Sequence, residues 1–211
     1  MVLTELSVRD LLSQFSSPSP TPGGGSAAAL ASSIGASLLM MVAGLPKTRS
    51  GSDEDRQALT SAAAALGAIR QELVQAVDAD SAAYDQVVAA YKRPKGSDEE
   101  QRARKEAIQI ALHAATDVPL LVMRLSALAL GQTEIVAAHG NRSASSDVGV
   151  AIALLMAGTA GAMLNVDVNL DTIADTAYRD AVRLESRTLM QAVGDAAERA
   201  ESRLQDSPDG V

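Results

Sequence analysis

One carboxylate in this sequence lies where a charge is least expected, on an apolar helical face. Between residues 73 and 91 the apolar side chains recur at helical spacing, and Asp80 falls in the middle of the face that they form. A buried charge is costly unless it is paired or performs a chemical task. We give two interpretations equal weight: Asp80 is a hydrogen-bond partner for a neighbouring helix, or it is an acid–base group in an active site.

A run of glycines, PGGGS at residues 22–26, precedes a long apolar segment. Exposed amides at the start of a helix can hold an anion or lie against a flat ligand, which makes Gly23, Gly24, Gly25 and Ser26 candidates for binding. The alternative is a flexible turn, after which Ser26 caps the next helix. The segment is not a nucleotide phosphate loop, because no Lys follows the glycines.

Two lysines and two asparagines are further candidate binding residues. Lys92 and Lys95 lie at the end of the helix that carries Asp80, where they either form an anion site or simply complement the helix C-terminus. Asn165 and Asn169 follow a second apolar segment at a four-residue spacing, which would align them on a helix.

Further polar residues, Asn141 and Asp147, precede that second apolar segment. Polar residues at both ends of a buried helix indicate that it lines a cavity, although for Asp147 alone a helix-dipole partner is the simpler explanation. His113 and His139 have no partner at a recognisable spacing, and the chain contains 0 cysteines. We therefore predict no metal site and no catalytic histidine.

Long helices must position these residues. The sequence predicts a short helix from Ser7 and longer helices over about 27–46, 52–91, 97–131, from 146 onward, and over 171–204. A bend is expected at Pro119, and only residues 165–170 alternate enough to suggest a strand. We predict an all-α fold, a bundle of long helices around a central Ala/Gly-rich apolar helix. Residues 1–211 form a single domain, with a disordered tail from about residue 205.

Composition limits the possible partners. Hydrophobic residues make up 47% of the 211 residues but aromatic residues only 2%, so small and aliphatic side chains must fill the core. The net charge of -8 argues against a nucleic-acid partner. Residues 27–46 and 148–166 are long enough to cross a bilayer, but their Ala, Gly and Ser content favours buried helices. With no signal peptide recognisable at the start of the chain, we expect a cytoplasmic protein without a membrane partner.

Six segments, taken in order, resemble the family of formiminotetrahydrofolate cyclodeaminases and methenyltetrahydrofolate cyclohydrolases. They are PTPGGGS at 20–26, DADSAAY at 78–84, KRPK at 92–95, HGN at 139–141, SSD at 145–147 and NVDVNL at 165–170. The resemblance implies an all-α enzyme that forms a homodimer or higher homo-oligomer. It also implies a tetrahydrofolate substrate bound between helices or between subunits, and acid–base chemistry with no metal or redox cofactor.

The resemblance also suggests roles for the candidate residues. Asp80 is the first candidate for the catalytic carboxylate, and Asp147 is the second. The amides of Asn141, Asn165 and Asn169 would orient the pterin or the reacting nitrogen. For the remaining contacts to the folate, Lys92 and Lys95 would meet the glutamate tail, while Gly23, Gly24, Gly25, Ser26 and Tyr84 would line the ligand.

The family includes two reactions, and both pass through a tetrahedral carbon. In the cyclohydrolase reaction, water opens the methenyl bridge of 5,10-methenyltetrahydrofolate to give 10-formyltetrahydrofolate. In the cyclodeaminase reaction, the folate N10 attacks a formimino carbon and ammonia leaves. No formiminotransferase domain precedes the helical part, which favours the hydrolase. Residues 44–52 are shorter than in the family, which suggests that a folate contact is missing, and a non-catalytic helical dimer is the third alternative.

Overall fold

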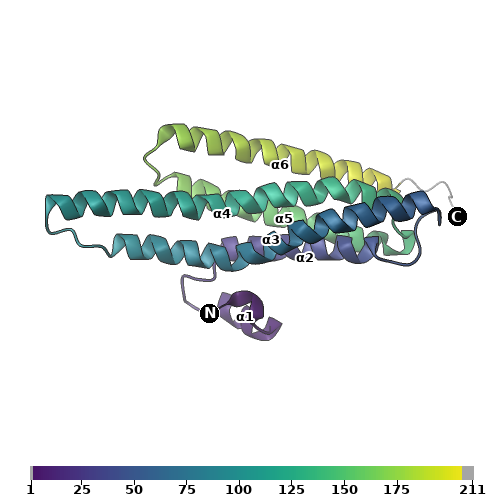
Figure 1. Cartoon of the computed structure of the whole chain (residues 1–211), viewed down its shortest axis with the longest axis horizontal. Coiled ribbons are helices and arrows are strands. Elements are labelled where there is room, and N and C mark those ends of the chain that lie inside the picture. Colours follow the sequence, from purple (N-terminus) through teal and green to yellow (C-terminus); the bar gives the residue numbers. More distant parts are fainter. Residues whose placement is uncertain (1, 206–211) are drawn as a thin grey trace.

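Long helices account for nearly all of the chain in the computed structural model, which describes residues 2–205 (Figure 1). Their order is η1 (Leu3–Glu5), α1 (Val8–Phe15), α2 (Gly24–Ala43), α3 (Asp53–Tyr91), α4 (Asp98–His139), η2 (Arg142–Ala144), α5 (Ser145–Leu170) and α6 (Thr176–Gln205). No strand occurs in this range. The all-α prediction is therefore confirmed.

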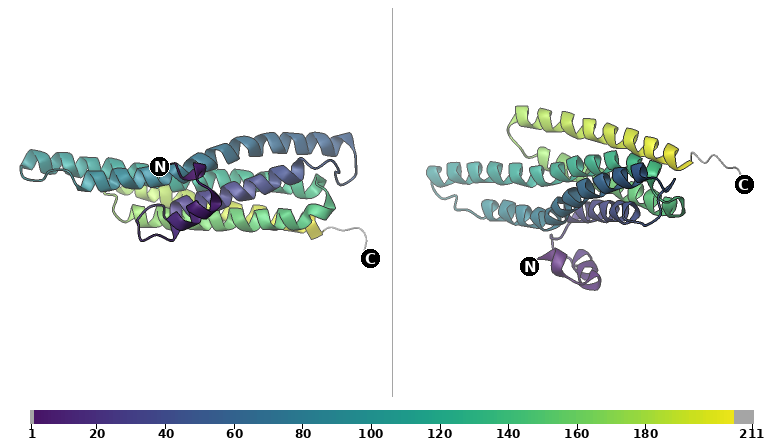
Figure 2. Two further views of the ribbon diagram at one scale, coloured as in Figure 1. Left: turned by 90° about the horizontal axis from the view of Figure 1, so that it is seen from below. Right: turned by 45° about the vertical axis from the view of Figure 1, so that its right-hand side comes forward.

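Four helices form a bundle, in which α2 and α4 each pack against both α3 and α5. The sixth helix, α6, lies along the outside of α4 and α5. The hairpin between α3 and α4 extends beyond the other helices at one end, and the α2–α3 and α4–α5 connections lie at the other (Figure 2). Helix α1 stands off the bundle, next to the start of α2.

Several helix starts follow the local sequence as predicted. Ser7 accepts a hydrogen bond from the Asp10 amide, and Ser52 caps α3 in the same way. At the start of α4, Ser97 and Glu100 form a reciprocal capping box. Helix α3 also ends at Tyr91, as expected.

Other boundaries differ from the prediction. Helix α2 begins at Gly24 with Gly23 as its N-cap, so the prediction that Ser26 caps this helix is wrong. Helix α4 does not end near Gly131: it continues to His139, because residues on both sides of that glycine are buried in the core.

The strand suggested for residues 165–170 is also absent, since Val166 and Leu170 are buried at helical spacing on α5. Helix α6 starts at Thr176 instead of residue 171. The predicted disordered tail lies outside the described residues except for Gln205, which is the last residue of α6.

Small residues let α2 and α5 pack closely. A Cβ atom on Gly158 would lie 2.8 Å from the carbonyl oxygen of Ala28, and one on Gly161 would lie 3.3 Å from the Ala28 Cβ. The Ser32 hydroxyl, also at this contact, accepts a hydrogen bond of 2.8 Å from Ser126 on α4. Close helix packing thus replaces the large aromatic side chains that the sequence lacks.

Three helices, α2, α4 and α5, are long and apolar enough to span a bilayer by length and composition alone. The bundle buries 56% of the apolar window of α2 and of α4, but only 39% of that of α5. Helix α5 therefore presents the largest share of uncovered apolar sequence among the three.

Replacing Gly158 with alanine should destabilise the protein, because the new methyl group forces α2 and α5 apart. We expect the free energy of unfolding to fall by about 2–3 kcal/mol in urea denaturation. Gly131→Ala is the matched control: it lies in a helix with open space around its Cβ position, so stability should rise by up to about 1 kcal/mol. Equal effects of the two substitutions would contradict close α2–α5 packing.

Candidate active site at the start of α2

The carboxylate of Asp80 lies against the first turn of α2. Its Oδ2 accepts a hydrogen bond of 2.8 Å from the Ser26 amide and is 3.1 Å from the Ser26 hydroxyl. That hydroxyl is buried and is also 2.8 Å from the Val77 carbonyl oxygen and 3.1 Å from Ser81 Oγ. The positive end of the α2 dipole faces the carboxylate as well. Asp80 is thus a hydrogen-bond partner of a neighbouring helix, which is the first of the two interpretations of this residue from the sequence.

Two of the three consecutive glycines provide room for this contact. A Cβ atom on Gly25 would overlap Asp80 Oδ1, and one on Gly24 would lie 3.3 Å from Asn165 Nδ2. None of the three has a positive φ, because Gly51 is the one residue in the described range that does. The alternative of a flexible turn is therefore wrong, and the glycines allow a close approach of Asp80 and Asn165 to the backbone.

Burial dominates the electrostatics of this carboxylate. Desolvation raises the pKa of Asp80 above its usual range, and the two hydrogen bonds from Ser26 oppose that rise. Both contacts go to Oδ2, and no donor from the described part of the chain reaches Oδ1. Ser26 therefore holds one oxygen of Asp80, while the other lies against Gly25 without a donor from the described residues.

An apolar groove of about 430 Å³ lies between α3 and the end of α5. On α3, Tyr84 lies one helical turn after Asp80, and on α5, Asn169 lies one turn after Asn165. Tyr84 and Asn169 both line the groove. Its lining is Tyr84, Val87, Val88, Tyr91, Lys92, Leu112, Val168, Asn169 and Thr172. We call this the α3–α5 groove; its volume suits a small organic ligand.

The two asparagines use their amide nitrogens within the protein. Asn165 Nδ2 donates to the Gly161 carbonyl at 2.8 Å, and Asn169 Nδ2 donates to the Ala115 carbonyl at 2.9 Å. Each side chain is fixed in this way, and its Oδ1 is an acceptor for a donor on a ligand.

The structure brings most of the predicted residues together. Gly24, Gly25, Ser26, Asp80 and Asn165 form one cluster, with Gly23 as the preceding N-cap, and Tyr84, Lys92 and Asn169 line the adjoining groove. Lys95 is exposed in the α3–α4 connection, outside that lining.

Two predicted residues, Asn141 and Asp147, lie elsewhere. Asp147 is in the first turn of α5 and lies 18 residues before Asn165, which corresponds to about 27 Å of helix. Asn141 precedes α5 and accepts hydrogen bonds from the amide and hydroxyl of Ser143. Within one copy of the chain, both residues therefore lie toward the opposite end of α5 from Asn165.

Sequence reasoning missed two pairings of the histidines. His139 Nδ1 lies 2.7 Å from Asp55 Oδ1, and this contact, together with two hydrogen bonds from Ser50, lowers the pKa of Asp55 far below its usual range. His113 stacks on Tyr178 at 4.1 Å. Both partners are more than 60 residues away in the sequence, so spacing gives no signal for either pair.

Asp78, two residues before Asp80 on α3, makes a further contact between distant parts of the sequence. Its carboxylate accepts hydrogen bonds from the Leu3 amide and from Thr4 Oγ1, the latter at 2.7 Å. It therefore fixes η1 to α3. Among the described residues, no three His, Asp or Glu side chains are grouped so that they could hold a metal ion.

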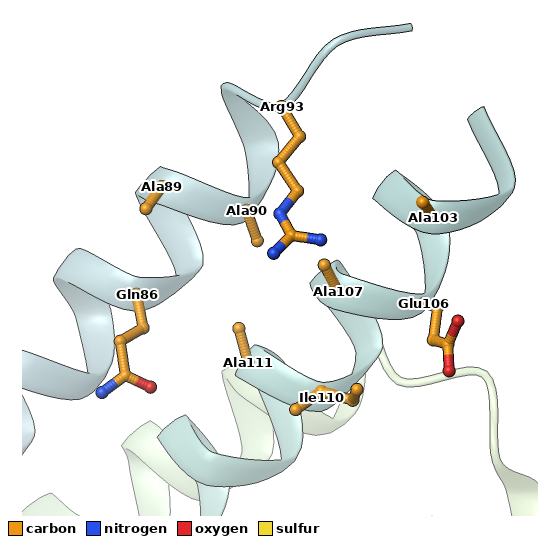
Figure 3. Close-up of a pocket in the computed structure, with 9 residues that line it drawn as sticks. All are labelled: Gln86, Ala89, Ala90, Arg93, Ala103, Glu106, Ala107, Ile110 and Ala111. Atoms are coloured by element: carbon orange, nitrogen blue, oxygen red, sulfur yellow. The ribbon is translucent and has the colours of Figure 1, made fainter. Parts of the chain in front are cut away.

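A second groove, of about 410 Å³, lies between α3 and α4 near their hairpin (Figure 3). Arg93, two residues after the end of α3, extends over it, and much of the surface of the groove is alanine. Glu106 at its edge is the one carboxylate among its lining residues. The α3–α5 groove is the better candidate site, because it adjoins a partly buried carboxylate and two fixed amides.

These features define a helical protein whose site offers a desolvated carboxylate beside an apolar groove. The chain belongs to the formiminotransferase-cyclodeaminase family, whose model matches residues 7–188. It is 37% identical to a methenyltetrahydrofolate cyclohydrolase of Methylorubrum extorquens over 192 residues, which cover 91% of this chain and 92% of that protein.

Other relatives extend the comparison. The chain is 34% identical to the formimidoyltransferase-cyclodeaminase of Gallus gallus, with 82% of this chain matched to 32% of that longer protein. A solved structure of formiminotetrahydrofolate cyclodeaminase from Thermotoga maritima superimposes with a TM-score of 0.84 at 25% identity, over 95% of this chain and 96% of that one.

Replacing Asp80 with asparagine should stabilise the protein at neutral pH. Because the pKa of Asp80 is raised on folding, the folded chain binds this proton more tightly than the unfolded chain does. At a pH above the folded-state pKa, the charged carboxylate therefore lowers the free energy of unfolding. This effect disappears as the pH falls to about 4, which is the ordinary pKa of an Asp side chain. We expect Asp80→Asn to raise the Tm by a few degrees at pH 8, with a difference that shrinks toward pH 4.

The control for this measurement is Asp85→Asn, an exposed position on the same helix, which should leave the Tm nearly unchanged at every pH. A lower Tm for Asp80→Asn at pH 8 would mean that the hydrogen bonds to Ser26 outweigh desolvation.

Proposed function

We propose that this protein hydrolyses 5,10-methenyltetrahydrofolate to 10-formyltetrahydrofolate. The observation that carries the proposal is the position of Asp80: Ser26 holds one of its oxygens, no donor from the described residues reaches the other, and Tyr84, one helical turn further along α3, lines an apolar groove. The similarity to a methenyltetrahydrofolate cyclohydrolase over nearly the full length of both chains supports this choice of reaction.

The proposed mechanism uses Asp80 first as a base and then as an acid. The carboxylate takes a proton from a water molecule as the water oxygen attacks the cationic methenyl carbon. In the tetrahedral intermediate, the protonated Asp80 returns that proton to N5 as the bond between the carbon and N5 breaks. The hydroxyl proton of the intermediate leaves to solvent as the formyl C=O bond forms on N10. A pKa raised by burial suits both steps, because it makes Asp80 a stronger base.

In this proposal, the α3–α5 groove binds the rings and the glutamate tail of the folate. Tyr84 and Tyr91 offer flat apolar surfaces for its rings, and the free oxygen of Asn169 can accept a hydrogen bond from the pterin. Lys92 lies at the far end of the groove lining on α3 and can pair with the carboxylates of the glutamate tail. In a chain with net charge -8, such a local cation is needed to hold an anionic group.

The second candidate reaction is cyclodeamination. Two observations favour keeping it: the structural neighbour from Thermotoga maritima is a formiminotetrahydrofolate cyclodeaminase, and the same carboxylate can protonate departing ammonia. We also propose, as the resemblance implies, a cytoplasmic homodimer whose chemistry needs no metal or redox cofactor, because each step of the mechanism is a proton transfer, an addition or an elimination. The non-catalytic helical dimer is the third alternative.

Purified protein should consume 5,10-methenyltetrahydrofolate faster than the uncatalysed reaction, measured as loss of its near-ultraviolet absorbance. Asp80→Asn should lower kcat by about 100-fold or more, because the group that transfers the proton is lost. Ammonia release from 5-formiminotetrahydrofolate, without turnover of the methenyl compound, would select the deaminase. If neither substrate reacts and neither raises the Tm, the non-catalytic alternative is correct.

The glycine that admits the carboxylate gives a second test. Gly25→Ala should lower kcat/KM by about tenfold or more, because its methyl group displaces Asp80 from the position where Ser26 holds it. Gly23→Ala is the control, since a Cβ atom there would lie an ordinary 3.6 Å from the Pro20 carbonyl oxygen. Equal turnover by these two variants would contradict the assigned position of Asp80.

A further inference from the structure

Helix α4 packs against both walls of the α3–α5 groove and contributes one residue, Leu112, to its lining. Two half-buried polar side chains of α4, Arg104 and Gln109, lie outside that lining. At about 100° per residue, Leu112 leaves the helix about 80° around from Arg104, and Gln109 leaves it about 140° around in the same sense. Leu112 therefore points between the other two, and Arg104 and Gln109 flank the base of the groove on its two sides.

Arg104 holds the end of α3. Its Nε and Nη2 both donate to the Tyr91 carbonyl oxygen, at 3.1 and 3.0 Å, and its guanidinium carbon lies 5.6 Å from the centre of the Tyr91 ring. Tyr91 is the last residue of α3, where helix carbonyls lack a partner within the helix. Tyr91 and the following Lys92 both line the groove. Arg104 thus fixes one rim of the groove through the backbone and the ring of Tyr91.

Gln109 holds the opposite rim, in the connection between α5 and α6. Its Nε2 donates to the Thr172 carbonyl oxygen at 3.2 Å, and its Oε1 accepts from the Ala174 amide at 2.7 Å. Thr172 lines the groove, and Ile173 between the two contacts is buried. This connection has no helical hydrogen bonds of its own at these two groups, so the Gln109 amide takes their place.

Both rims lie at the end of the groove that is far from the carboxylate. Tyr91 is 11 residues after Asp80 on α3, which corresponds to about 17 Å of helix. In the proposed function the reacting carbon lies at Asp80, and the glutamate tail lies at Lys92. Arg104 and Gln109 therefore act on the part of the ligand farthest from the reaction, and they act through the residues that they hold.

We propose that Arg104 and Gln109 are positioning residues, which fix the two rims of the α3–α5 groove so that it binds the benzoyl ring and glutamate tail of a reduced folate. The proposal rests on the proposed function for the identity of the ligand. Rims that are ordered before the ligand arrives lose less conformational entropy on binding, which raises affinity. The proton transfer at Asp80 does not depend on either residue.

Titration calorimetry with tetrahydrofolate measures binding alone, because this ligand has no one-carbon unit that can react. Arg104→Leu and Gln109→Leu should each raise the Kd by about fivefold. The control is Tyr178→Phe, which removes a hydrogen bond of 2.7 Å from α6 to Asp117 of α4, two turns after Gln109 on the same face. It loosens α6 without touching the groove lining, so its Kd should equal that of the wild type. Equal losses in Tyr178→Phe and Gln109→Leu, or unchanged affinity in both leucine variants, would overturn the proposal.

Arg104→Lys separates position from charge. Lysine keeps the positive charge but lacks the planar fork that meets the Tyr91 carbonyl with two donors. We expect its Kd to rise nearly as much as that of Arg104→Leu. Full affinity in Arg104→Lys would mean that the charge alone attracts the anionic tail, and the positioning role of Arg104 would be wrong.

Amide hydrogen exchange reports on Gln109 without any ligand. Because the Ala174 amide donates to its side chain, Gln109→Leu should speed exchange at Ala174 by about tenfold or more. An unchanged exchange rate would show that Gln109 does not hold this connection, and the proposal would then be wrong for that rim.

Steady-state kinetics separates positioning from catalysis. With the methenyl compound, Arg104→Leu and Gln109→Leu should raise KM by about fivefold and leave kcat within about twofold of the wild type. A fall in kcat comparable to that of Asp80→Asn would contradict a positioning role. If the wild type binds tetrahydrofolate but turns over neither substrate, the proposed reaction fails while the binding measurements still decide this proposal. If the wild type does not bind tetrahydrofolate, both proposals fail.

Discussion

The contact between a carboxylate and the first turn of a helix determines how the site is built. Asp80 can approach the amide of Ser26 only because Gly25 has no side chain, and the buried Ser26 hydroxyl in turn contacts the Val77 carbonyl one turn earlier on α3. The start of α2 and the middle of α3 are therefore fixed relative to each other by polar groups. The cost of burying the charge is partly offset by those hydrogen bonds and by the helix dipole.

The rest of the bundle brings α5 to the same point. Glycine and serine at the α2–α5 contact let the two helices lie close together, so the end of α5 reaches the start of α2 and places Asn165 beside Gly24. Larger side chains at Gly158 or Gly161 would separate the helices and widen this junction. The scarcity of aromatic residues thus follows from the same packing that forms the site. The Tyr side chains of the α3–α5 groove are exposed on α3, away from that contact.

Much of this was predictable from local sequence. Helix starts at Ser7, Ser52 and Ser97 follow from capping, and Asp80 was identified because one charge on an apolar face violates the helical pattern. Sequence reasoning could not give the end of α4, because burial around Gly131 outweighs the low helix propensity of glycine. Nor could it pair His139 with Asp55 or reveal that Asp147 lies far from Asp80, since both depend on which helix ends meet in the bundle.

The hairpin between α3 and α4 carries one wall of the α3–α5 groove beyond the start of α2 (Figure 1). That part of α3 packs against α4 but has no helix on its other side, so its local opening costs less free energy than opening of the bundle centre. The opposite wall, on α5, is held by the Asn169 contact to α4. The two walls therefore differ in mobility, and amide hydrogen exchange in the hairpin would slow when a ligand bridges them.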